Sequence, residues 1–96
     1  MLFRSHWYER FAQMDGSGNA DPAFGTREFI VGTGGQGLDA PAQQLPTSEA
    51  INASTHGVLK LTLHPNSYDW EFIPVEGGTF HDSGSGVCVT SPAVTF

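Results

Sequence analysis

The clearest alternation of hydrophobic and polar positions lies in the second half of the chain. Residues 57–64 alternate between leucine and other side chains, and residues 68–75 alternate between aromatic and mostly polar ones. A period of two is typical of a β-strand. Residues 65–67, Pro-Asn-Ser, favour a turn between the runs, and Pro74 limits further strand pairing. We predict an antiparallel hairpin over residues 57–75, with two apolar faces that contact one core: Leu59, Leu61 and Leu63, and Tyr68, Trp70 and Phe72.

A second, shorter strand is predicted in the first half of the chain. Phe29-Ile30-Val31 is an apolar run inside residues 28–32, and its length and composition indicate a strand buried on both faces. Residues 13–26 precede it and are rich in glycine, aspartate, asparagine and proline, which predicts a loop.

The remaining segments predict little regular structure. Residues 36–56 contain two prolines and many small polar residues, so we expect a long connection with at most one helical turn near residues 48–51. Residues 77–87 return to glycine and serine, with Phe80 as an apolar anchor. The expected fold class is therefore mainly β, loop-rich and with little helix.

Composition agrees with this fold class and restricts the function. The chain has 96 residues, enough for one small domain, with 12 glycines and 15% charged residues. Its net charge is −6 with only four Lys and Arg, which argues against nucleic-acid binding and against anionic membrane surfaces. No apolar run approaches the roughly 20 residues that span a bilayer. Cys88 is the single cysteine, so no internal disulfide can form.

The two ends of the chain are expected to lie outside the folded unit. Residues 1–5, Met-Leu-Phe-Arg-Ser, have neither the apolar core nor the cleavage site of a signal peptide. Their codons can match the end of a sequencing adapter, so we interpret them as an assembly scar, with the native sequence beginning at His6. Residues 89–96 are interpreted as a tail or the start of a linker.

The residues from His6 onward resemble a known family. Calcineurin-like metallophosphoesterases, within them the purple-acid-phosphatase-like branch, carry Gly-His-x-His followed by x-Tyr-Glu-Arg-Phe, and residues 6–11 match the second histidine and the run after it. The first histidine of that motif maps onto Arg4, which cannot bind a metal because it stays protonated. The similarity extends from His6 to about Cys88 through later segments: residues 27–35, residues 57–65 and 67–72, and residues 78–80 and 82–86.

The resemblance implies that residues 6–88 are the C-terminal part of an α/β metallophosphoesterase sandwich. Such an enzyme hydrolyses phosphate esters with water activated by two divalent or trivalent metal ions. His6 maps onto one metal ligand, whereas most of the family's ligands precede this motif. We therefore expect the fragment alone to be inactive, to bind no metal stably, and to need the remainder of the domain. The family also suggests a secreted or extracellular location.

The resemblance assigns further roles near His6. Tyr8, Glu9 and Arg10 would orient the ligand or support the structure around it, although an ordinary surface ion pair explains Glu9 or Arg10 equally well. Gly32, Thr33, Gly34 and Gly35 would form a sharply turning loop close to the substrate. With Gly37, this loop spells Gly-x-Gly-x-x-Gly, but Pro41 and Pro46 interrupt the helix that a dinucleotide site requires.

Other patterns have simpler interpretations. The alternating polar residues from Asp15 to Asp21 lack the glycine and glutamate of a calcium loop, which leaves a polar turn as the main interpretation and calcium as the alternative. Three scattered histidines indicate solvated surface residues: His56, His64 and His81. Asn52-Ala53-Ser54 is a glycosylation sequon, which matters only in a eukaryotic secretory pathway.

A different class of function is the alternative to an enzyme fragment. The chain could be a small acidic β-rich binding or assembly module, in which Tyr68, Trp70 and Phe72 form a contact surface instead of a core face. Whichever class is right, exposed strand edges predict self-association of the fragment when it is made alone.

Overall fold

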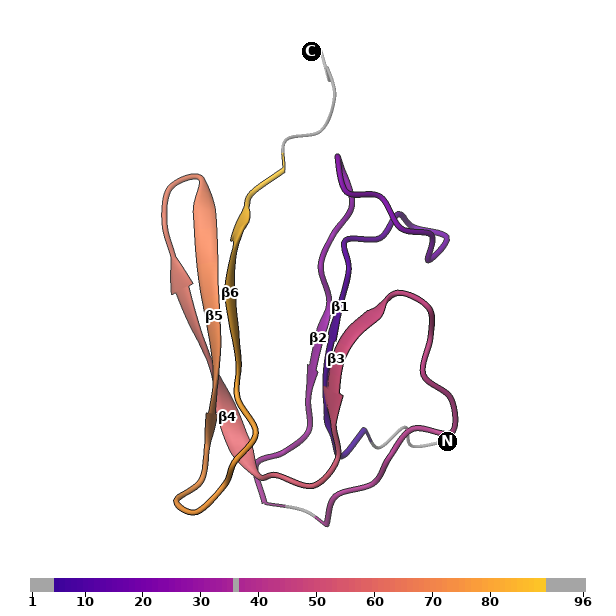
Figure 1. Ribbon diagram of the computed structural model, residues 1–96. Helices are drawn as coiled ribbons and strands as arrows, with labels where there is room; N and C mark the ends of the chain where they lie inside the picture. Colours follow the sequence, from indigo (N-terminus) through magenta and orange to yellow (C-terminus); the bar gives the residue numbers. More distant parts are fainter. Residues whose placement is uncertain (1–4, 36, 90–96) are drawn as a thin grey trace.

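Two small antiparallel sheets make up the protein (Figure 1). A computed structural model describes residues 5–35 and 37–89, and these contain strands and loops but no helix, hence none that could cross a membrane. The first sheet has the order β2-β1-β3 and the second the order β4-β5-β6. The mainly β, loop-rich prediction is confirmed. The strands are β1 Tyr8–Phe11, β2 Phe29–Val31, β3 Ser48–Asn52, β4 Gly57–Leu63, β5 Ser67–Pro74 and β6 Asp82–Val87.

The first sheet is built around β1, which pairs with β2 on one side and with β3 on the other. The predicted strand at residues 28–32 is confirmed as β2, with Tyr8 opposite Val31 and Arg10 opposite Phe29. Its predicted burial on both faces is wrong, because Val31 is 37% exposed. The reason is its position at the edge of the sheet, where it has a neighbouring strand on one side only.

The strand β3 replaces the helical turn that the sequence predicted near residues 48–51. Ile51 lies opposite Glu9 and Ala50 lies opposite Arg10, so the segment is extended. Ser-Glu-Ala-Ile-Asn has no strong β preference of its own, and pairing with β1 therefore decides its conformation. The register shifts between Arg10 and Phe11, which gives this pairing an irregularity at one end.

The second sheet contains the predicted hairpin. Leu59, Leu61 and Leu63 lie opposite Phe72, Trp70 and Tyr68, so the leucines and the aromatic rings share one face. Trp70 and Phe72 are buried, as expected, but Leu61 is 50% exposed and Leu63 is 77% exposed. The leucine face is thus only partly in the core. A groove of about 270 Å³ runs beside these leucines, with Phe29 and Arg27 of the first half of the chain among its lining residues.

The strand β6 was not foreseen, because Asp-Ser-Gly-Ser-Gly-Val looks like a loop. Its glycines face the aromatic rings of β5: Gly84 lies opposite Trp70 and Gly86 lies opposite Tyr68. A Cβ atom at Gly84 would lie 2.4 Å from Cζ2 of Trp70, and one at Gly86 would lie 2.4 Å from the ring of Tyr68. Glycine is therefore needed there so that the large rings can cover the neighbouring strand.

The core lies between the two facing sheets and is mainly aromatic. The ring of Tyr8 on β1 packs against Phe72 at 4.8 Å and against Phe80 at 5.6 Å between centroids. Phe29 on β2 packs against Trp70 at 5.6 Å. The prediction that Phe80 anchors its glycine-rich segment is confirmed by these contacts and by its contact with Phe72 at 5.4 Å. Tilted pairs of this kind stabilise a small core by about 0.5–1.5 kcal/mol each beyond burial.

Candidate functional site

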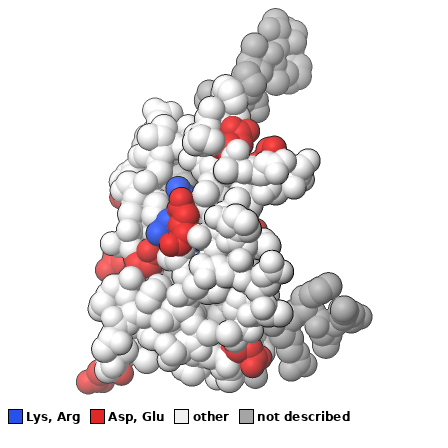
Figure 2. All heavy atoms as spheres, turned by 45° about the vertical axis from the view of Figure 1, so that its right-hand side comes forward, with Lys and Arg blue, Asp and Glu red and all other residues white. Residues whose placement is uncertain are grey.

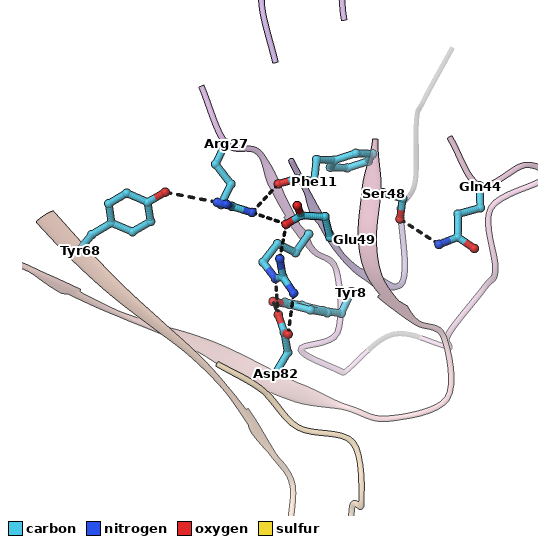
Figure 3. Close-up of polar contacts among 9 residues, drawn as sticks. Tyr8, Phe11, Arg27, Gln44, Ser48, Glu49, Tyr68 and Asp82 are labelled. Atoms are coloured by element: carbon cyan, nitrogen blue, oxygen red, sulfur yellow. Dashed lines mark hydrogen bonds and ion pairs between the residues drawn. The ribbon is translucent and has the colours of Figure 1, made fainter. Parts of the chain in front are cut away.

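A polar network joins the two sheets across one side of the core (Figure 3). We call it the inter-sheet network: Tyr8, Arg10, Arg27, Glu49 and Asp82. Its centre is the carboxylate of Asp82 on β6, which accepts hydrogen bonds from Tyr8 Oη at 2.5 Å, Arg10 Nε at 2.8 Å and Arg10 Nη2 at 3.1 Å. Arg10 Nη1 also pairs with Glu49 on β3. Arg10 thus ties all three of β1, β3 and β6 together.

The second arginine of the network extends it toward the hairpin. Arg27 Nη1 donates to the carbonyl of Phe11 at 2.8 Å and to Glu49 Oε1 at 2.6 Å, while its Nε lies 3.3 Å from Tyr68 Oη. Both guanidinium groups also lie over the ring of Trp70, at 5.1 Å for Arg10 and 4.9 Å for Arg27. Two cations against one indole form a favourable contact because the ring face is electron-rich.

The network shifts the pKa values of its members. Burial opposes ionisation of Asp82, but the hydrogen bonds from Arg10 and Tyr8 outweigh it, so the pKa of Asp82 lies below its usual range. Burial and the bond to Asp82 raise the pKa of Tyr8 well above its usual value, and the bond to Asp82 raises the pKa of Arg10. The indole Nε1 of Trp70 is buried without a well-aligned hydrogen-bond partner in the described residues, although it helps to lower the pKa of Asp82.

The basic groups occupy a small part of the surface. Figure 2 shows one spot of basic atoms bordered by acidic atoms, with other acidic groups scattered over the same face. Arg10 pairs with Asp82 and Glu49, and Arg27 pairs with Glu49, so these two arginines do not form a basic patch that could hold a polyanion.

The structure brings His6 together with the predicted glycine loop. His6, Gly32, Gly34 and Gly35 line an open hollow of about 340 Å³, which we call the glycine-loop hollow. The N–H of Gly32 donates to the carbonyl of Trp7 at 3.0 Å, so the loop is held against the segment that enters β1. A Cβ atom at Gly32 would lie 1.7 Å from the carbonyl oxygen of Ser5, and only glycine permits this approach.

Thr33 has a different place from its glycine neighbours. Its side chain is fully buried, and its hydroxyl donates to the carbonyl of Gly57 at 2.8 Å. The N–H of Gly57 donates to the carbonyl of Thr33 at 3.1 Å. Thr33 therefore connects the glycine loop to the start of β4 and does not face the hollow.

The residues that follow His6 in β1 make their contacts elsewhere in the molecule. Tyr8 and Arg10 belong to the inter-sheet network, whereas Glu9 is 3% exposed and accepts a hydrogen bond from Trp7 Nε1 at 2.9 Å. Within the part of the chain that the structure describes, no hydrogen bond or ion pair joins these three side chains to the imidazole. Their contacts hold the strand that follows His6. The structural interpretation of Tyr8, Glu9 and Arg10 accounts for these contacts.

One residue beside His6 was missed by sequence reasoning. Asp39 Oδ2 lies 3.8 Å from His6 Nδ1, and the N–H of Asp39 donates to the carbonyl of His6 at 2.9 Å. Asp39 is the only carboxylate between Gly32 and Ser48, and this isolation was the available signal.

The structure places the imidazole of His6 and the carboxylate of Asp39 side by side, near the start of β1. A zinc site of the catalytic type takes about three protein ligands. Within residues 5–35 and 37–89, no group of three or more His, Cys, Asp or Glu side chains is placed to hold a metal ion. His6 and Asp39 are thus fewer side chains than a site of this type uses.

Comparisons with family models, curated proteins and solved structures find no match to this chain. The resemblance to metallophosphoesterases thus stays a prediction from the sequence.

Two of the three residues in the alternative aromatic contact surface are buried in the structure. Trp70 is 6% exposed and Phe72 is 1% exposed, and both pack against residues of the first sheet. Only Tyr68 is partly exposed, and it lines the groove beside Leu61 and Leu63.

The other sequence patterns form local structure. Asp15 Oδ1 accepts hydrogen bonds from the N–H groups of Ser17 and Asn19, which makes a polar turn within the loop. His64 Nε2 lies 2.8 Å from Asp69 Oδ2, and Ser85 Oγ donates to the other oxygen of Asp69. The aspartate lies between the serine and the histidine, which is not the order that activates a nucleophile.

Proposed function

We propose that this chain is the C-terminal part of a metallophosphoesterase domain and contributes His6 to a two-metal centre. The observation that carries the proposal is the position of His6, at the entrance to β1 and beside an open hollow lined by glycines. Its side chain is 20% exposed, so the imidazole is held by its surroundings and still accessible. This is the placement that a ligand to a metal shared with a missing segment requires.

The residues around His6 suggest which nitrogen would bind the metal. Nδ1 lies on the side of Asp39, at 3.8 Å, and histidine ligands commonly donate their second N–H toward a carboxylate. This leaves Nε2 of the neutral imidazole for the metal. Tyr8 and Arg10 would act at a distance by fixing β1 to Asp82.

The proposed substrate is a phosphate ester, bound against the open side of the glycine-loop hollow. Glycines there leave the backbone accessible, which suits the approach of a phosphate group. The metal ions, when bound, would polarise the ester and activate water. The 96 residues alone are proposed to be inactive, because they carry too few ligands to retain two ions.

The test uses the intact domain, obtained by extending the coding sequence upstream of His6. His6→Ala should lower bound metal, measured by mass spectrometry, and should reduce hydrolysis of p-nitrophenyl phosphate by at least about a hundredfold. His64→Ala is the matched control, because His64 is also a histidine but lies on the distant hairpin turn. Full metal content and activity in His6→Ala would refute the proposal.

The alternative of a binding or assembly module is supported by a different surface. The aromatic residues of β5 are mostly buried, but one long edge of the second sheet is open.

A further inference from the structure

The strand β4 presents an open edge whose hydrogen-bonding groups can be assigned. β4 is the outer strand of the second sheet, on the side away from β6 (Figure 1). The N–H of His64 donates to the carbonyl of Ser67, and in antiparallel pairing such bonded pairs recur at every second residue. The N–H and C=O groups that face away from β5 are therefore those of Leu59, Leu61 and Leu63.

The start of β4 agrees with this assignment. Gly57 belongs to the same alternate set, and both of its outward groups are bonded to Thr33. From Leu59 to Leu63, by contrast, the outward backbone groups have no partner among the contacts of the described residues.

β4 is also less protected than the other sheet edges. β2 has three residues, and β3 has an irregular register with β1. β6 offers mostly glycine and serine. β4 has seven residues, a regular register, no proline and one charge, Lys60. Natural edges usually carry bulges, prolines or several charges that prevent pairing with another chain.

We propose that β4 pairs with β4 of a second copy of this chain, antiparallel and centred on Leu61. In this register Leu61 lies opposite Leu61 of the second copy, and Leu59 lies opposite Leu63. Each such pair exchanges two hydrogen bonds, so the three pairs form about six. The half-exposed Leu61 is then covered by Leu61 of the second copy, and the more exposed Leu63 is covered by Leu59 of the second copy. The second sheet of one copy and the second sheet of the other copy then form one continuous sheet.

Repulsion between lysines and the missing N–H of Pro65 exclude the two neighbouring registers. Centring on Lys60 would place two lysines directly opposite each other, which is destabilising. Centring on Thr62 would place Leu59 opposite Pro65, which has no N–H to donate. Centring on Leu61 places Lys60 opposite Thr62 without like charges. It also places Gly57 opposite Pro65, where no hydrogen bond is lost because the outward groups of Gly57 are already bonded to Thr33.

The second copy is the occupant that the exposed side chains fit. The leucine row of one copy is complementary to itself under a two-fold axis, whereas a charged peptide would find one lysine and no other charge on β4. The net charge of −6 on each copy opposes association, so the dimer should become tighter as salt screens this repulsion. A dimer held by ion pairs would instead become weaker as salt is added, so the direction of the salt effect distinguishes the two kinds of interface.

The register can be tested by disulfide trapping in the 96-residue chain. Cys88 is exposed and is first replaced by serine to remove its own cross-linking. Cysteines at position 61 would have Cα atoms about 5.5 Å apart, within the roughly 4.4–6.8 Å of disulfides. Cysteines at position 60 would be about 8 Å apart. Under mild oxidation Leu61→Cys should form covalent dimer at least about tenfold faster than Lys60→Cys. Equal rates would refute the register.

Sedimentation velocity over a range of concentrations tests the dimer itself. Leu61→Lys should weaken self-association by about tenfold or more, because two lysines then meet at the centre. Val87→Lys is the control, since Val87 is 74% exposed on the opposite edge of the same sheet. Circular dichroism checks that both variants are folded. A monomeric parent chain at all concentrations and salts, or equal weakening by both substitutions, would overturn the proposal. No metal or substrate enters these assays, so their outcome is independent of the phosphoesterase test.

Discussion

Asp82 is the single side chain whose removal should most weaken the contact between the two sheets. Asp82→Asn keeps the size of the side chain and one acceptor oxygen but removes the negative charge. The wild-type carboxylate accepts three hydrogen bonds, from Tyr8 Oη and from two nitrogens of Arg10, and the side chain is 11% exposed. The substitution therefore changes a largely buried charge pair and leaves the backbone of β6 unchanged.

The expected loss can be worked out from these bonds. A hydrogen bond to a charged group contributes a net of about 1.5–3 kcal/mol, but three bonds that share one carboxylate are not additive. Arg10 keeps its ion pair with Glu49, which limits the cost of leaving its guanidinium without Asp82. We expect a decrease in the free energy of unfolding of about 2–3 kcal/mol. For a domain of this size, that lowers the melting temperature by about 10–20 °C.

The assay is urea denaturation followed by tryptophan fluorescence, because Trp70 lies against both arginines of the network. Asp69→Asn is the matched control. Asp69 is also an aspartate of the second sheet with hydrogen bonds from other side chains, but its side chain is 46% exposed. Its substitution should change stability far less. If Asp82→Asn unfolds at the same urea concentration as wild type, or if both substitutions have equal effects, the network does not hold the sheets together.

Three further outcomes follow from the same structure. The pKa of Asp82 is lower in the folded state than in the unfolded state. The stability that Asp82 contributes is therefore complete above the unfolded pKa of about 3.9 and is lost as the pH falls through the folded pKa. In thermal melts, Asp82→Asn should flatten the decrease in stability at acid pH. The pKa of Tyr8 is raised, so its stabilisation is complete below about pH 10 and lost above it, and Tyr8→Phe should remove that alkaline limb in thermal melts. Gly84→Ala should destabilise by about 1–3 kcal/mol in urea titrations because its Cβ would meet the ring of Trp70, whereas Gly16→Ala, with open space around it, should change little.

Sequence reasoning located the parts of the fold that follow from local pattern. The hairpin was predictable because both strands alternate strictly, and β2 because three apolar residues follow a loop. β3 was not, since Ser48–Asn52 becomes a strand only through pairing with β1. β6 was not, since the value of its glycines depends on the rings of Trp70 and Tyr68 across the sheet. In both cases the deciding information lies in the partner strand and not in the segment itself.

The candidate site was predictable to a similar extent. The resemblance pointed to His6 and to the glycine loop, and the structure places them around one hollow. Thr33 is buried away from the hollow, and Asp39 lies beside His6 from the following connection, which no short motif reveals. The role of Arg10 required the position of Asp82, which is 72 residues later in the chain.

The contacts of β1 link the stability of the sandwich to the position of His6. One residue separates His6 from Tyr8, and the N–H of Gly32 holds the intervening Trp7 through its carbonyl. Tyr8 is in turn fixed to Asp82 on the opposite sheet. A movement of β6 would thus shift Tyr8, and through Trp7 it would also shift the imidazole of His6. Under the proposed function, a domain that lost the bond to Asp82 would retain every metal ligand and would still hold His6 less firmly. Asp82 is therefore far from His6 along the sequence, but only Tyr8 and Trp7 lie between the two in this chain of contacts.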